Sequence, residues 1–430
     1  MTAYATVLPQ RRGACPGLSA PMATGDGLLV RLVPIGSIPL SAFAGLCTAA
    51  QTYGNGIIEI TSRGSIQVRG LSAASASGFA AEVGTLGIAA EDGIPILCNP
   101  LAGLADDELF DAAPFAAELR RVLAQRSMAA RLGAKVSVAI DGGGVLNLAT
   151  LSADIRLKAE AINGNVALRV GIAGDETSAT DLGLVTPADG IETVMRLLDV
   201  LAKRGRNMRA RDVLATKGSA VFRAAAADIL ERDASPRLSP RFSEAIGIHP
   251  IRGGLFVCGI GLGFGHAHAA ALERLTDAAR AAGASGQRAA PGRALMTIGL
   301  TRATAADFVT AAEELGFIVR ADDPRRSVVA CAGAPICASA HIAARTIAPV
   351  IADAVARHMG RRQTIHISGC AKGCAHSAAA TLTVVGTPDG CALVADGSAR
   401  DAPFAIVATA QLPAAIARHA RDHKREAGHV

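Results

Sequence analysis

The segment Gly25–Gly36 reads GDGLLVRLVPIG, and an altered version of it, RGGLFVCGIGLG, stands at Arg252–Gly263. In both, a run of aliphatic residues lies between glycines, which is typical of a strand bounded by turns. Further pairs of similar segments follow in the same order along the chain. The 430 residues are therefore predicted to form two copies of a unit of roughly 200 residues, related by a pseudo-twofold axis.

Three more segment pairs support this duplication. They are Val68–Ile88 with Thr297–Phe317, Pro95–Gly103 with Val328–Cys337 and, less clearly, Val136–Gly144 with Ile365–Gly373. The alignment puts Cys258 opposite Arg31 and Cys331 opposite Cys98. Chance similarity in an alanine- and glycine-rich chain is the alternative, and four matches in one order favour duplication over it.

The periodicity of apolar residues predicts the elements of each copy. In the first copy we expect strands at 27–33, 56–61 and 65–69, and helices at 39–53 and 73–86. The resulting α+β fold has a ferredoxin-like half followed by an α/β half in each copy. The expected domains are 1–90, 91–240, 241–317 and 318–430, with the joint between the copies at the proline-containing segment 238–248.

Composition narrows the class of protein. Half of the residues are hydrophobic, so a large core can be buried, whereas aromatic residues make up only 3% and tryptophan is absent. The net charge of +6 suits an anionic ligand such as a polycarboxylate. Nucleic acid is not expected as a partner, because the chain offers few aromatic rings for base stacking and no long run of Lys and Arg.

No contact with a membrane is expected either. The longest apolar run, 255–265, is about half the length of a membrane span and is rich in glycine. The first residues contain no apolar signal segment. The predicted location is therefore the cytoplasm.

Four of the nine cysteines gather in the second copy, in the stretches CAGAPIC and SGCAKGC. Cys331 and Cys337 follow a predicted strand and lead into a predicted helix at 337–348, and Cys370 and Cys374 follow the next strand. Neighbouring strand ends can bring four thiolates to one point. The spacings C-x5-C and C-x3-C, with small residues between the cysteines, favour a 4Fe–4S cluster. A zinc site and buried structural cysteines remain alternatives, whereas the C-x2-C motif of a redox dithiol is absent.

This pattern resembles that of the sulfite and nitrite reductase family, in which it binds a 4Fe–4S cluster whose last cysteine also bridges to siroheme iron. TSRGSIQVRG at Thr61–Gly70 is similar to a family segment whose arginine faces the tetrapyrrole. GLLVRL and GAKVSVAIDGGG match positions with a basic residue near the macrocycle. The resemblance spans nearly the whole chain and implies the duplicated fold of this family, with the cluster on Cys331, Cys337, Cys370 and Cys374.

Within that superfamily the chain most resembles the precorrin-3B synthases of aerobic cobalamin synthesis. The similarity lies in RRGACPGLSAPMATGDGLLVRL at 11–32 and in CAGAPICASA and SGCAKGCAHS. It implies a monooxygenase that uses O2 to hydroxylate precorrin-3A at C20 and closes a γ-lactone with the ring A acetate. The tetrapyrrole is then a substrate, and a separate NADH-linked reductase or a ferredoxin supplies the electrons.

Precorrins and siroheme both carry many carboxylates, so either needs a basic cradle. Arginine suits it because its planar fork pairs with a carboxylate through two hydrogen bonds. The candidates, each of which could instead face solvent, are Arg31, Arg63, Gln67, Arg69 and Lys135.

Two residues beside the last cysteines, Lys372 and His376, are the candidates for a catalytic role. A second, non-heme iron could use imidazoles from His341, His366 and His376, although a lone histidine is more often structural.

Two other functions stay open. A siroheme-dependent sulfite or nitrite reductase is disfavoured by the short chain and by CAKGC where reductases usually have CPNGC. A non-catalytic Fe–S electron carrier is disfavoured by the basic residues of the first copy, which such a carrier does not need.

Overall fold

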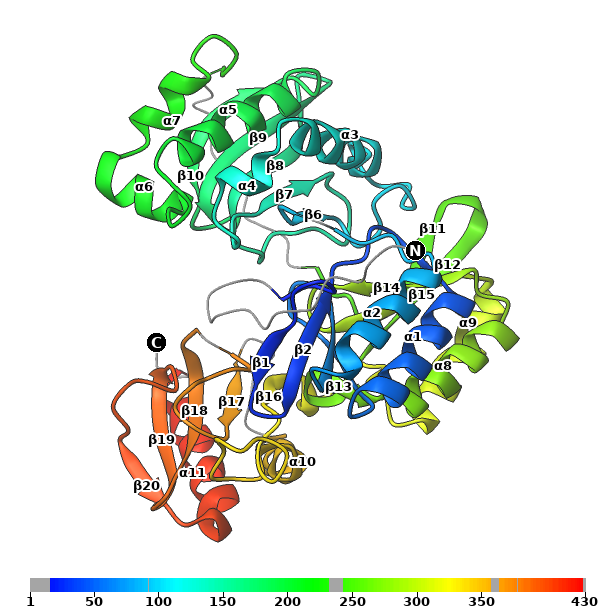
Figure 1. Ribbon diagram of the computed structural model, residues 1–430, viewed down its shortest axis with the longest axis vertical. Coiled ribbons are helices and arrows are strands. Elements are labelled where there is room, and N and C mark those ends of the chain that lie inside the picture. Colours follow the sequence, from blue (N-terminus) through cyan, green and yellow to red (C-terminus); the bar gives the residue numbers. More distant parts are fainter. Residues whose placement is uncertain (1–15, 92, 232–242, 357–362, 377, 428–430) are drawn as a thin grey trace.

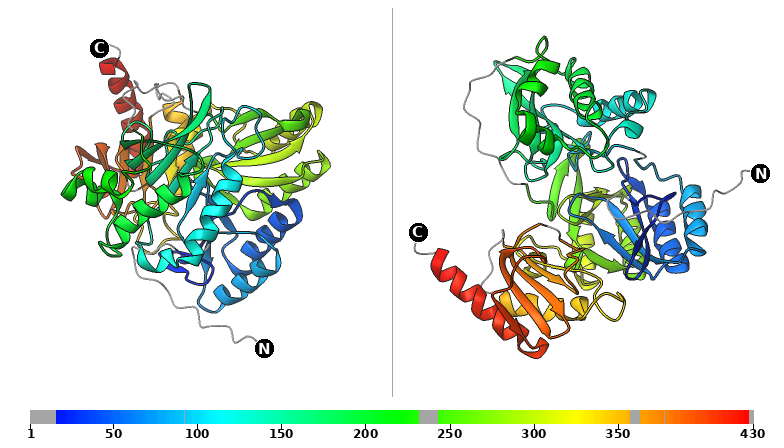
Figure 2. Two further views of the ribbon diagram at one scale, coloured as in Figure 1. Left: turned by 90° about the horizontal axis from the view of Figure 1, so that it is seen from above. Right: turned by 60° about the vertical axis from the view of Figure 1, so that its left-hand side comes forward.

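The computed structural model describes residues 16–91, 93–231, 243–356, 363–376 and 378–427. Three lobes are visible in Figure 1 and in the right-hand view of Figure 2, whereas they overlap when seen from above in the left-hand view. The central lobe combines the ferredoxin-like halves of both copies, and each of the other two lobes is one α/β unit. Part of the predicted joint between the copies, 238–242, lies outside the described residues.

The central lobe contains two five-stranded sheets. The first sheet has the order β1-β2-β5-β4-β13, and the second has the order β11-β12-β15-β14-β3. The strands of the first sheet, in chain order, are β1 Met22–Thr24, β2 Gly27–Leu32, β4 Ile57–Ile60, β5 Ile66–Leu71 and β13 His266–His268. Those of the second are β3 Ile38–Pro39, β11 Gly247–Ile251, β12 Leu255–Gly261, β14 Gly286–Ala290 and β15 Ala294–Leu300.

The two halves exchange one short strand each. Strand β13, from the second copy, pairs antiparallel with β4, so that His266 lies opposite Glu59. Strand β3, from the first copy, pairs antiparallel with β14 in the same manner, with Ile38 opposite Gln287. This reciprocal exchange is what a pseudo-twofold axis between two copies requires, and it confirms the duplication read from the sequence.

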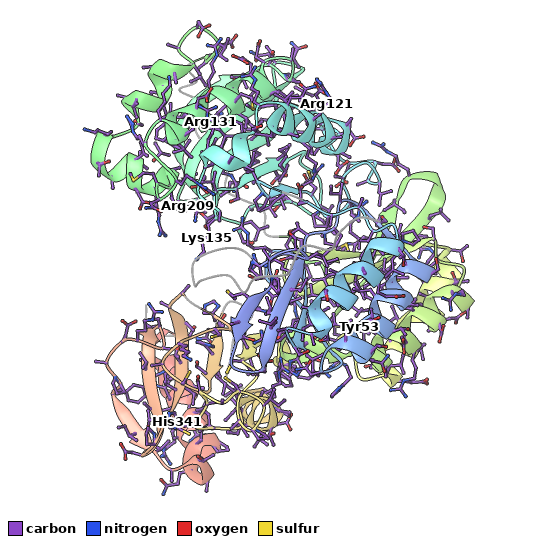
Figure 3. All side chains as sticks on the ribbon, in the orientation of Figure 1. Tyr53, Arg121, Arg131, Lys135, Arg209 and His341 are labelled. Atoms are coloured by element: carbon purple, nitrogen blue, oxygen red, sulfur yellow. The ribbon has the colours of Figure 1, made fainter. Side chains whose placement is uncertain are left out.

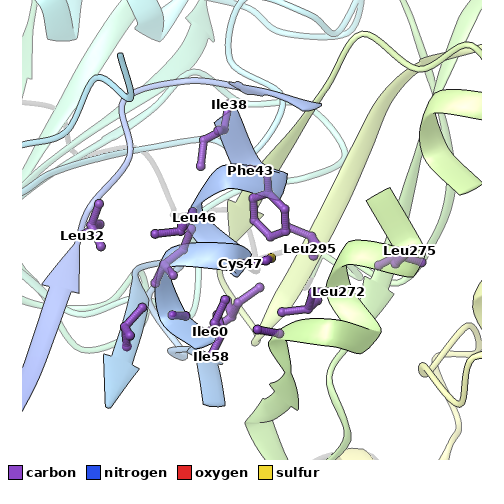
Figure 4. Close-up of a cluster of buried hydrophobic side chains, with 14 of the residues drawn as sticks. Leu32, Ile38, Phe43, Leu46, Cys47, Ile58, Ile60, Leu272, Leu275 and Leu295 are labelled. Atoms are coloured by element: carbon purple, nitrogen blue, oxygen red, sulfur yellow. The ribbon is translucent and has the colours of Figure 1, made fainter. Parts of the chain in front are cut away.

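Four helices cover the outer faces of these sheets, and their buried side chains form one shared core. They are α1 Leu40–Tyr53, α2 Ser75–Thr85, α8 Ala269–Ala281 and α9 Arg302–Glu314. Phe43 and Leu46 of α1 lie close to Leu272 of α8 and Leu295 of β15 in Figure 4. Because residues of both copies fill this core, neither ferredoxin-like half buries its own apolar surface alone.

The other two lobes repeat a second architecture. Their sheets run β6-β7-β8-β9-β10 and β16-β17-β18-β19-β20, with the first two pairings parallel and the last two antiparallel. The strands are β6 Ile96–Cys98, β7 Val138–Asp141, β8 Ala153–Ile162, β9 Asn165–Gly174, β10 Thr180–Val185, β16 Val328–Ala330, β17 Ile365–Ser368, β18 Ala380–Thr387, β19 Gly390–Gly397 and β20 Ala405–Val407.

The helices of these lobes lie against their sheets. In the first α/β lobe they are α3 Ala112–Gln125, α4 Met128–Arg131, α5 Gly190–Ala202, α6 Ala210–Lys217 and α7 Ala220–Ala225, and in the second they are α10 Ala344–Val355 and α11 Leu412–Ala427. The short 3₁₀ helices are η1 Arg252–Gly254, η2 Gly263–Gly265, η3 Pro324–Ser327 and η4 Thr409–Gln411. Within the described residues, no helix is long and apolar enough to cross a membrane.

The strand registers correct two of the residue pairs expected between the copies. Val30 and Cys258 pair with Val68 and Thr297 at equivalent ladder positions, so Cys258 corresponds to buried Val30 and not to Arg31. The alignment was wrong by one residue, and one residue in a strand moves a side chain to the opposite face of the sheet.

A similar shift affects the cysteine loops. Cys98 pairs with Ile140 as Ala330 pairs with Ile367, which makes Asn99 the counterpart of Cys331. The weakest segment match was wrong by two residues, because Val138 and not Val136 occupies the place of Ile365.

The α+β class and the five elements predicted for the first ferredoxin-like half are confirmed, with ends that differ by at most two residues. The helix predicted at 337–348 was wrong in its start, since α10 begins at Ala344. Backbone N–H groups of the intervening loop bond outside any helix: that of Ala338 donates to the Gly25 carbonyl, and that of His341 to the Gly369 carbonyl. The apolar run 255–265 contains strand β12 and the short 3₁₀ helix η2.

Candidate functional site

A cavity of about 420 Å³ lies where the first sheet faces the second α/β lobe. Its walls come from three parts of the chain: strands β2, β4 and β5, the turns around Phe264 and Arg293, and the loops that carry Cys331 and Cys374. Four of the five predicted cradle residues line it together with two of the four predicted cysteine ligands and one predicted catalytic residue. They are Arg31, Arg63, Gln67, Arg69, Cys331, Cys374 and His376.

Strand periodicity explains why the basic residues share this face. On β5 the side chains of Ile66 and Val68 are fully buried in the core, so Gln67 and Arg69 point to the other side of the sheet. Arg31 of β2 lies directly opposite Gln67 in the antiparallel ladder and therefore on the same face.

Arg69 is held by two acids at the edge of the cavity. Its Nε and Nη2 donate to the two carboxylate oxygens of Asp26, both at 2.8 Å, and its Nη1 donates to Glu59 at 3.3 Å. Burial opposes ionisation of Asp26, but the hydrogen bond and charge of Arg69 outweigh it and lower the pKa of that carboxyl. Arg69 is thus fixed in place by the protein, and its fork has little left to offer a ligand.

Arg345, at the start of α10, extends this network into the second α/β lobe. Its Nη2 donates to the other oxygen of Glu59 at 2.5 Å, which links the cysteine-bearing lobe to the first sheet. Its Nε and Nη1 are buried and have no hydrogen-bond partner among the described residues. Burial lowers the pKa of Arg345, and the nearby charge of Glu59 counteracts that effect.

Arg63 contacts the first α/β lobe, and Lys135 belongs to that lobe. Arg63 Nη1 donates to the Ser152 carbonyl at 2.7 Å and Nη2 to Ser137 Oγ at 3.1 Å, so this residue joins the cavity rim to that lobe. Lys135 is exposed on the lower edge of the first α/β lobe in Figure 3 and does not line the cavity.

The two cysteine loops follow adjacent parallel strands and are tied to each other. Cys331 directly follows β16, and Cys370 lies two residues beyond β17. The Gly369 N–H donates to Cys331 Sγ at 3.0 Å, and Lys372 Nζ donates to Ser339 Oγ at 2.6 Å. Burial raises the pKa of the Cys331 thiol, and the backbone N–H groups of Gly369 and Gly333 oppose that increase.

These thiols fit an iron–sulfur cluster by their chemistry. Cysteine is the predominant donor in such centres, and N–H groups directed at the sulfurs stabilise the thiolate form. Within the described part of the chain, no three His, Cys, Asp or Glu side chains converge on one position as they would for a single metal ion. The arrangement is therefore one of two facing loops and not of a closed single-ion site.

Glycines let the N-terminal hairpin pack against these loops. A Cβ atom on Gly25, in the β1–β2 turn, would lie 2.2 Å from Cys337 Sγ, far inside van der Waals contact. The same turn carries Asp26, the partner of Arg69. The hairpin thus connects Cys337 to the basic face of the cavity.

The histidines and Lys372 occupy different positions around the cysteine loops. His376 lines the cavity, and its Nε2 lies 3.3 Å from the Ala379 carbonyl. Its ring meets that of His366 edge to face, with the centroids 5.8 Å apart. His341, labelled on the second α/β lobe in Figure 3, and Lys372 are both exposed, and neither lines the cavity.

His366 is buried, and neither ring nitrogen has a hydrogen-bond partner among the described residues. Burial, together with the charges of His376 and Arg293, lowers its pKa to about 4. The fold therefore holds His366 as a neutral ring behind His376.

Sequence patterns did not identify Glu59, Arg293 or Arg345 as site residues. Glu59 belongs to β4, directly opposite Gln67, and the alternation of IIEI could have indicated its place on the polar face. Arg293 and Arg345 both come from the second copy: Arg293 reaches this site through the packing of the two ferredoxin-like halves within the central lobe, and Arg345 through the packing of the second α/β lobe on that lobe. No local sequence signal indicates such packing.

The equivalent face of the second sheet is apolar among the described residues. There, Met296 and Ile298 stand at the ladder positions of Gln67 and Arg69 and pack against Leu101 and Leu146 of the first α/β lobe. Among the described residues, one copy thus uses this face for a polar cavity and the other uses it for an apolar interface, so the two faces are asymmetric.

Comparison with known proteins gives the same class of protein as the fold. Residues 20–85 match the family described as the nitrite/sulfite reductase ferredoxin-like half domain. A solved structure of the NirA protein of Mycobacterium tuberculosis aligns with a TM-score of 0.75 over 93% of this chain and 81% of that one, at 18% sequence identity. The chain thus has the nitrite/sulfite reductase fold, a fold associated with iron–sulfur and siroheme-type binding.

Sequence similarity identifies the family of this chain within that class. A precorrin-3B synthase from Sinorhizobium sp. is 40% identical over 418 residues, which cover 97% of this chain and 90% of that protein. The chain belongs to the precorrin-3B synthase family.

Proposed function

We propose that this protein is a precorrin-3B synthase, a monooxygenase that hydroxylates precorrin-3A at C20 with formation of a γ-lactone. The observation that carries the proposal is the 40% identity to a precorrin-3B synthase along 97% of the chain. The geometry agrees with it, since one cavity combines a basic sheet face with two thiols from the cysteine loops.

The chain's own residues bind and orient the substrate in this proposal. Arg31 and Gln67 present donors on one face of the first sheet, and carboxylates of the tetrapyrrole are the natural acceptors. Arg69 acts indirectly, because Asp26 and Glu59 occupy its fork and make it a fixed part of the wall. Lys135, exposed on the first α/β lobe outside the cavity lining, is assigned in this proposal to a substituent that extends out of the cavity.

Cys331, Cys337, Cys370 and Cys374 would hold a 4Fe–4S cluster, which supplies electrons one at a time when bound. The overall reaction consumes O2, two electrons and two protons, places one oxygen atom on the substrate and releases the other as water. The electrons would come from NADH through a separate reductase or a ferredoxin. His376 lies on the cavity wall, where it could donate a proton to a reacting oxygen.

The experiment that tests this function uses protein purified without oxygen and supplied with a reductant. Precorrin-3A and 18O2 are added, and the product is analysed by mass spectrometry. We expect one 18O atom in a product that carries a new hydroxyl and a new lactone. Bound siroheme together with consumption of sulfite or nitrite would overturn the proposal and favour a reductase.

The cysteine ligands have a separate test that does not depend on turnover. Replacing any one of the four with serine should lower iron and sulfide from about four of each per chain, because an incomplete set of thiolates leaves an iron exposed. Cys98→Ser is the matched control, since Cys98 lies in the first α/β lobe, and it should keep full iron content. Full iron and sulfide in Cys370→Ser would contradict the assignment.

A further inference from the structure

Two hairpin turns meet at the wall of the cavity, and each carries one arginine that lines it. The turn between β4 and β5 holds Arg63, and the turn between β14 and β15 holds Arg293. Arg63 forms an antiparallel bridge with Pro291, and the Gly292 N–H donates to the Ser62 carbonyl at 3.0 Å. The two hairpins are equivalent elements of the two copies, and Gly64, the residue after Arg63, occupies the place of Arg293, with φ values of +80° and +64°.

The side chains of Arg63 and Arg293 differ in what they contact. The fork of Arg63 donates to Ser137 and Ser152 of the first α/β lobe. Arg293 lines the cavity beside Phe264 and Gly265. Within the described residues its guanidinium makes no hydrogen bond and no ion pair, and Glu59 is the one acid whose charge affects it.

The fold maintains Arg293 in this position at a cost. Its backbone φ of +64° is in the left-handed region, which residues other than glycine and asparagine rarely adopt. Gly265 makes room for it, because a Cβ atom there would lie 2.9 Å from Arg293 Cδ. Burial also lowers the pKa of the guanidinium. Strained residues of this kind occur most often at functional sites.

We infer that Arg293 binds a carboxylate of the tetrapyrrole and so fixes the macrocycle against the cysteine loops. A partly buried cation without a partner is stabilised by an anion that enters the cavity, and the planar fork of arginine matches a carboxylate. The neighbouring arginines Arg69 and Arg345 already pair with acids of the protein. This inference rests on the proposed function, which supplies the class of ligand.

The test compares three variants with the parent protein. Arg293→Gly removes the guanidinium and also relieves the positive φ, so the protein should be at least as resistant to heat while binding precorrin-3A more weakly. Arg293→Lys keeps a charge without the fork and should have an intermediate affinity. Arg320→Met changes an arginine that is 70% exposed elsewhere on this copy, and it should bind like the parent.

Binding is measured by absorbance titration with precorrin-3A, without oxygen and without reductant, so that no turnover occurs. We expect the dissociation constant of Arg293→Gly to increase roughly tenfold to a hundredfold, the range for a charge-assisted hydrogen bond. Iron content should not change. A parallel titration with sulfite separates a carboxylate site from a site for small anions.

Each outcome is decisive for the inference. Parent-like affinity for precorrin-3A in Arg293→Gly would overturn it, and so would a loss of sulfite binding without any loss of precorrin-3A binding. A parent protein that does not bind precorrin-3A would instead overturn the proposed function. Weaker precorrin-3A binding in Arg293→Gly than in Arg293→Lys, with full thermal stability in both, would support the role of the fork.

Discussion

At the scale of single residues, the site depends on small side chains as much as on charged ones. Gly25 lies against Cys337 with no room for a methyl group, and its carbonyl accepts from the Ala338 N–H at 3.1 Å. The next residue, Asp26, holds Arg69. One turn therefore packs against Cys337, accepts a hydrogen bond from Ala338 and holds Arg69. Of its two residues, only Asp26 carries a charge that indicates a chemical role.

Gly25→Ala should therefore disturb the cysteine loop. The new Cβ atom would lie 2.2 Å from Cys337 Sγ, so Cys337 or the hairpin must move, and we expect the protein to lose most of its iron and sulfide. Elemental analysis of protein purified without oxygen measures the effect. Gly84→Ala, in helix α2 with open space around it, is the matched control and should gain up to about 1 kcal/mol of stability. Parent-like iron content in Gly25→Ala would show that the hairpin does not constrain the loop.

Residue-level patterns in the sequence predicted part of this site. The resemblance to the reductases led to Arg31, Gln67 and Arg69 as candidates for binding the tetrapyrrole, and alternation along β2 and β5 explains why the three share one face. Arg293 could not be found in this way, because its turn reaches the cavity only when the two copies pack. The ion pair between Arg69 and Asp26 could not be predicted from the sequence either, since it depends on a contact between separate strands.

At the scale of elements, the two α/β lobes link the loops after their two parallel strands through different side chains. In the second lobe the Gly369 N–H donates to Cys331 Sγ at 3.0 Å. In the first lobe the Gly142 N–H donates to Asn99 Oδ1 at 2.6 Å, at the equivalent place after the strands. Asn99 Nδ2 in turn donates to Asp141, Gly143 and Leu146. An amide in the first lobe thus connects the loops that carry thiols in the second.

Asn99→Ala should destabilise the first α/β lobe without affecting the cysteine loops. The substitution leaves several buried polar groups without partners, which costs about 2–4 kcal/mol of unfolding free energy. Urea denaturation followed by circular dichroism measures the loss, and iron content should remain that of the parent. Asn165→Ala, on the exposed end of β9, should change stability by no more than about 0.5 kcal/mol. A similar small change in Asn99→Ala would mean that water replaces the amide without penalty.

The elements also show where sequence analysis reaches its limit. Apolar periodicity located the strands and helices of the ferredoxin-like half within a few residues, because burial on one face determines them. It failed at Cys337, where an alanine-rich stretch of high helix propensity forms a loop. Contacts of that loop with Gly25 and Gly369 outweigh the local propensity, and these contacts come from distant parts of the chain.

At the scale of the whole molecule, duplication followed by divergence gives one site from two copies. The exchange of β3 and β13 joins the halves into a central lobe with one core. Each sheet then offers its free face to the α/β lobe of the other copy. One face became polar and lines the cavity, and the other became apolar and packs through Met296 and Ile298.

This organisation predicts which fragments of the chain fold alone. Fragment 93–231 contains the whole of its own core, which lies between Ile94 and Phe222, and it should unfold cooperatively in urea. Fragment 16–91 should not, because it lacks β13 and the side chains of α8 and β15 that complete its core. Adding fragment 243–318 supplies both, so the mixture should form a one-to-one complex with cooperative unfolding. Light scattering and urea denaturation followed by circular dichroism measure both properties. Cooperative unfolding of fragment 16–91 as a monomer would show that the ferredoxin-like halves are independent domains and that the strand exchange does not couple them.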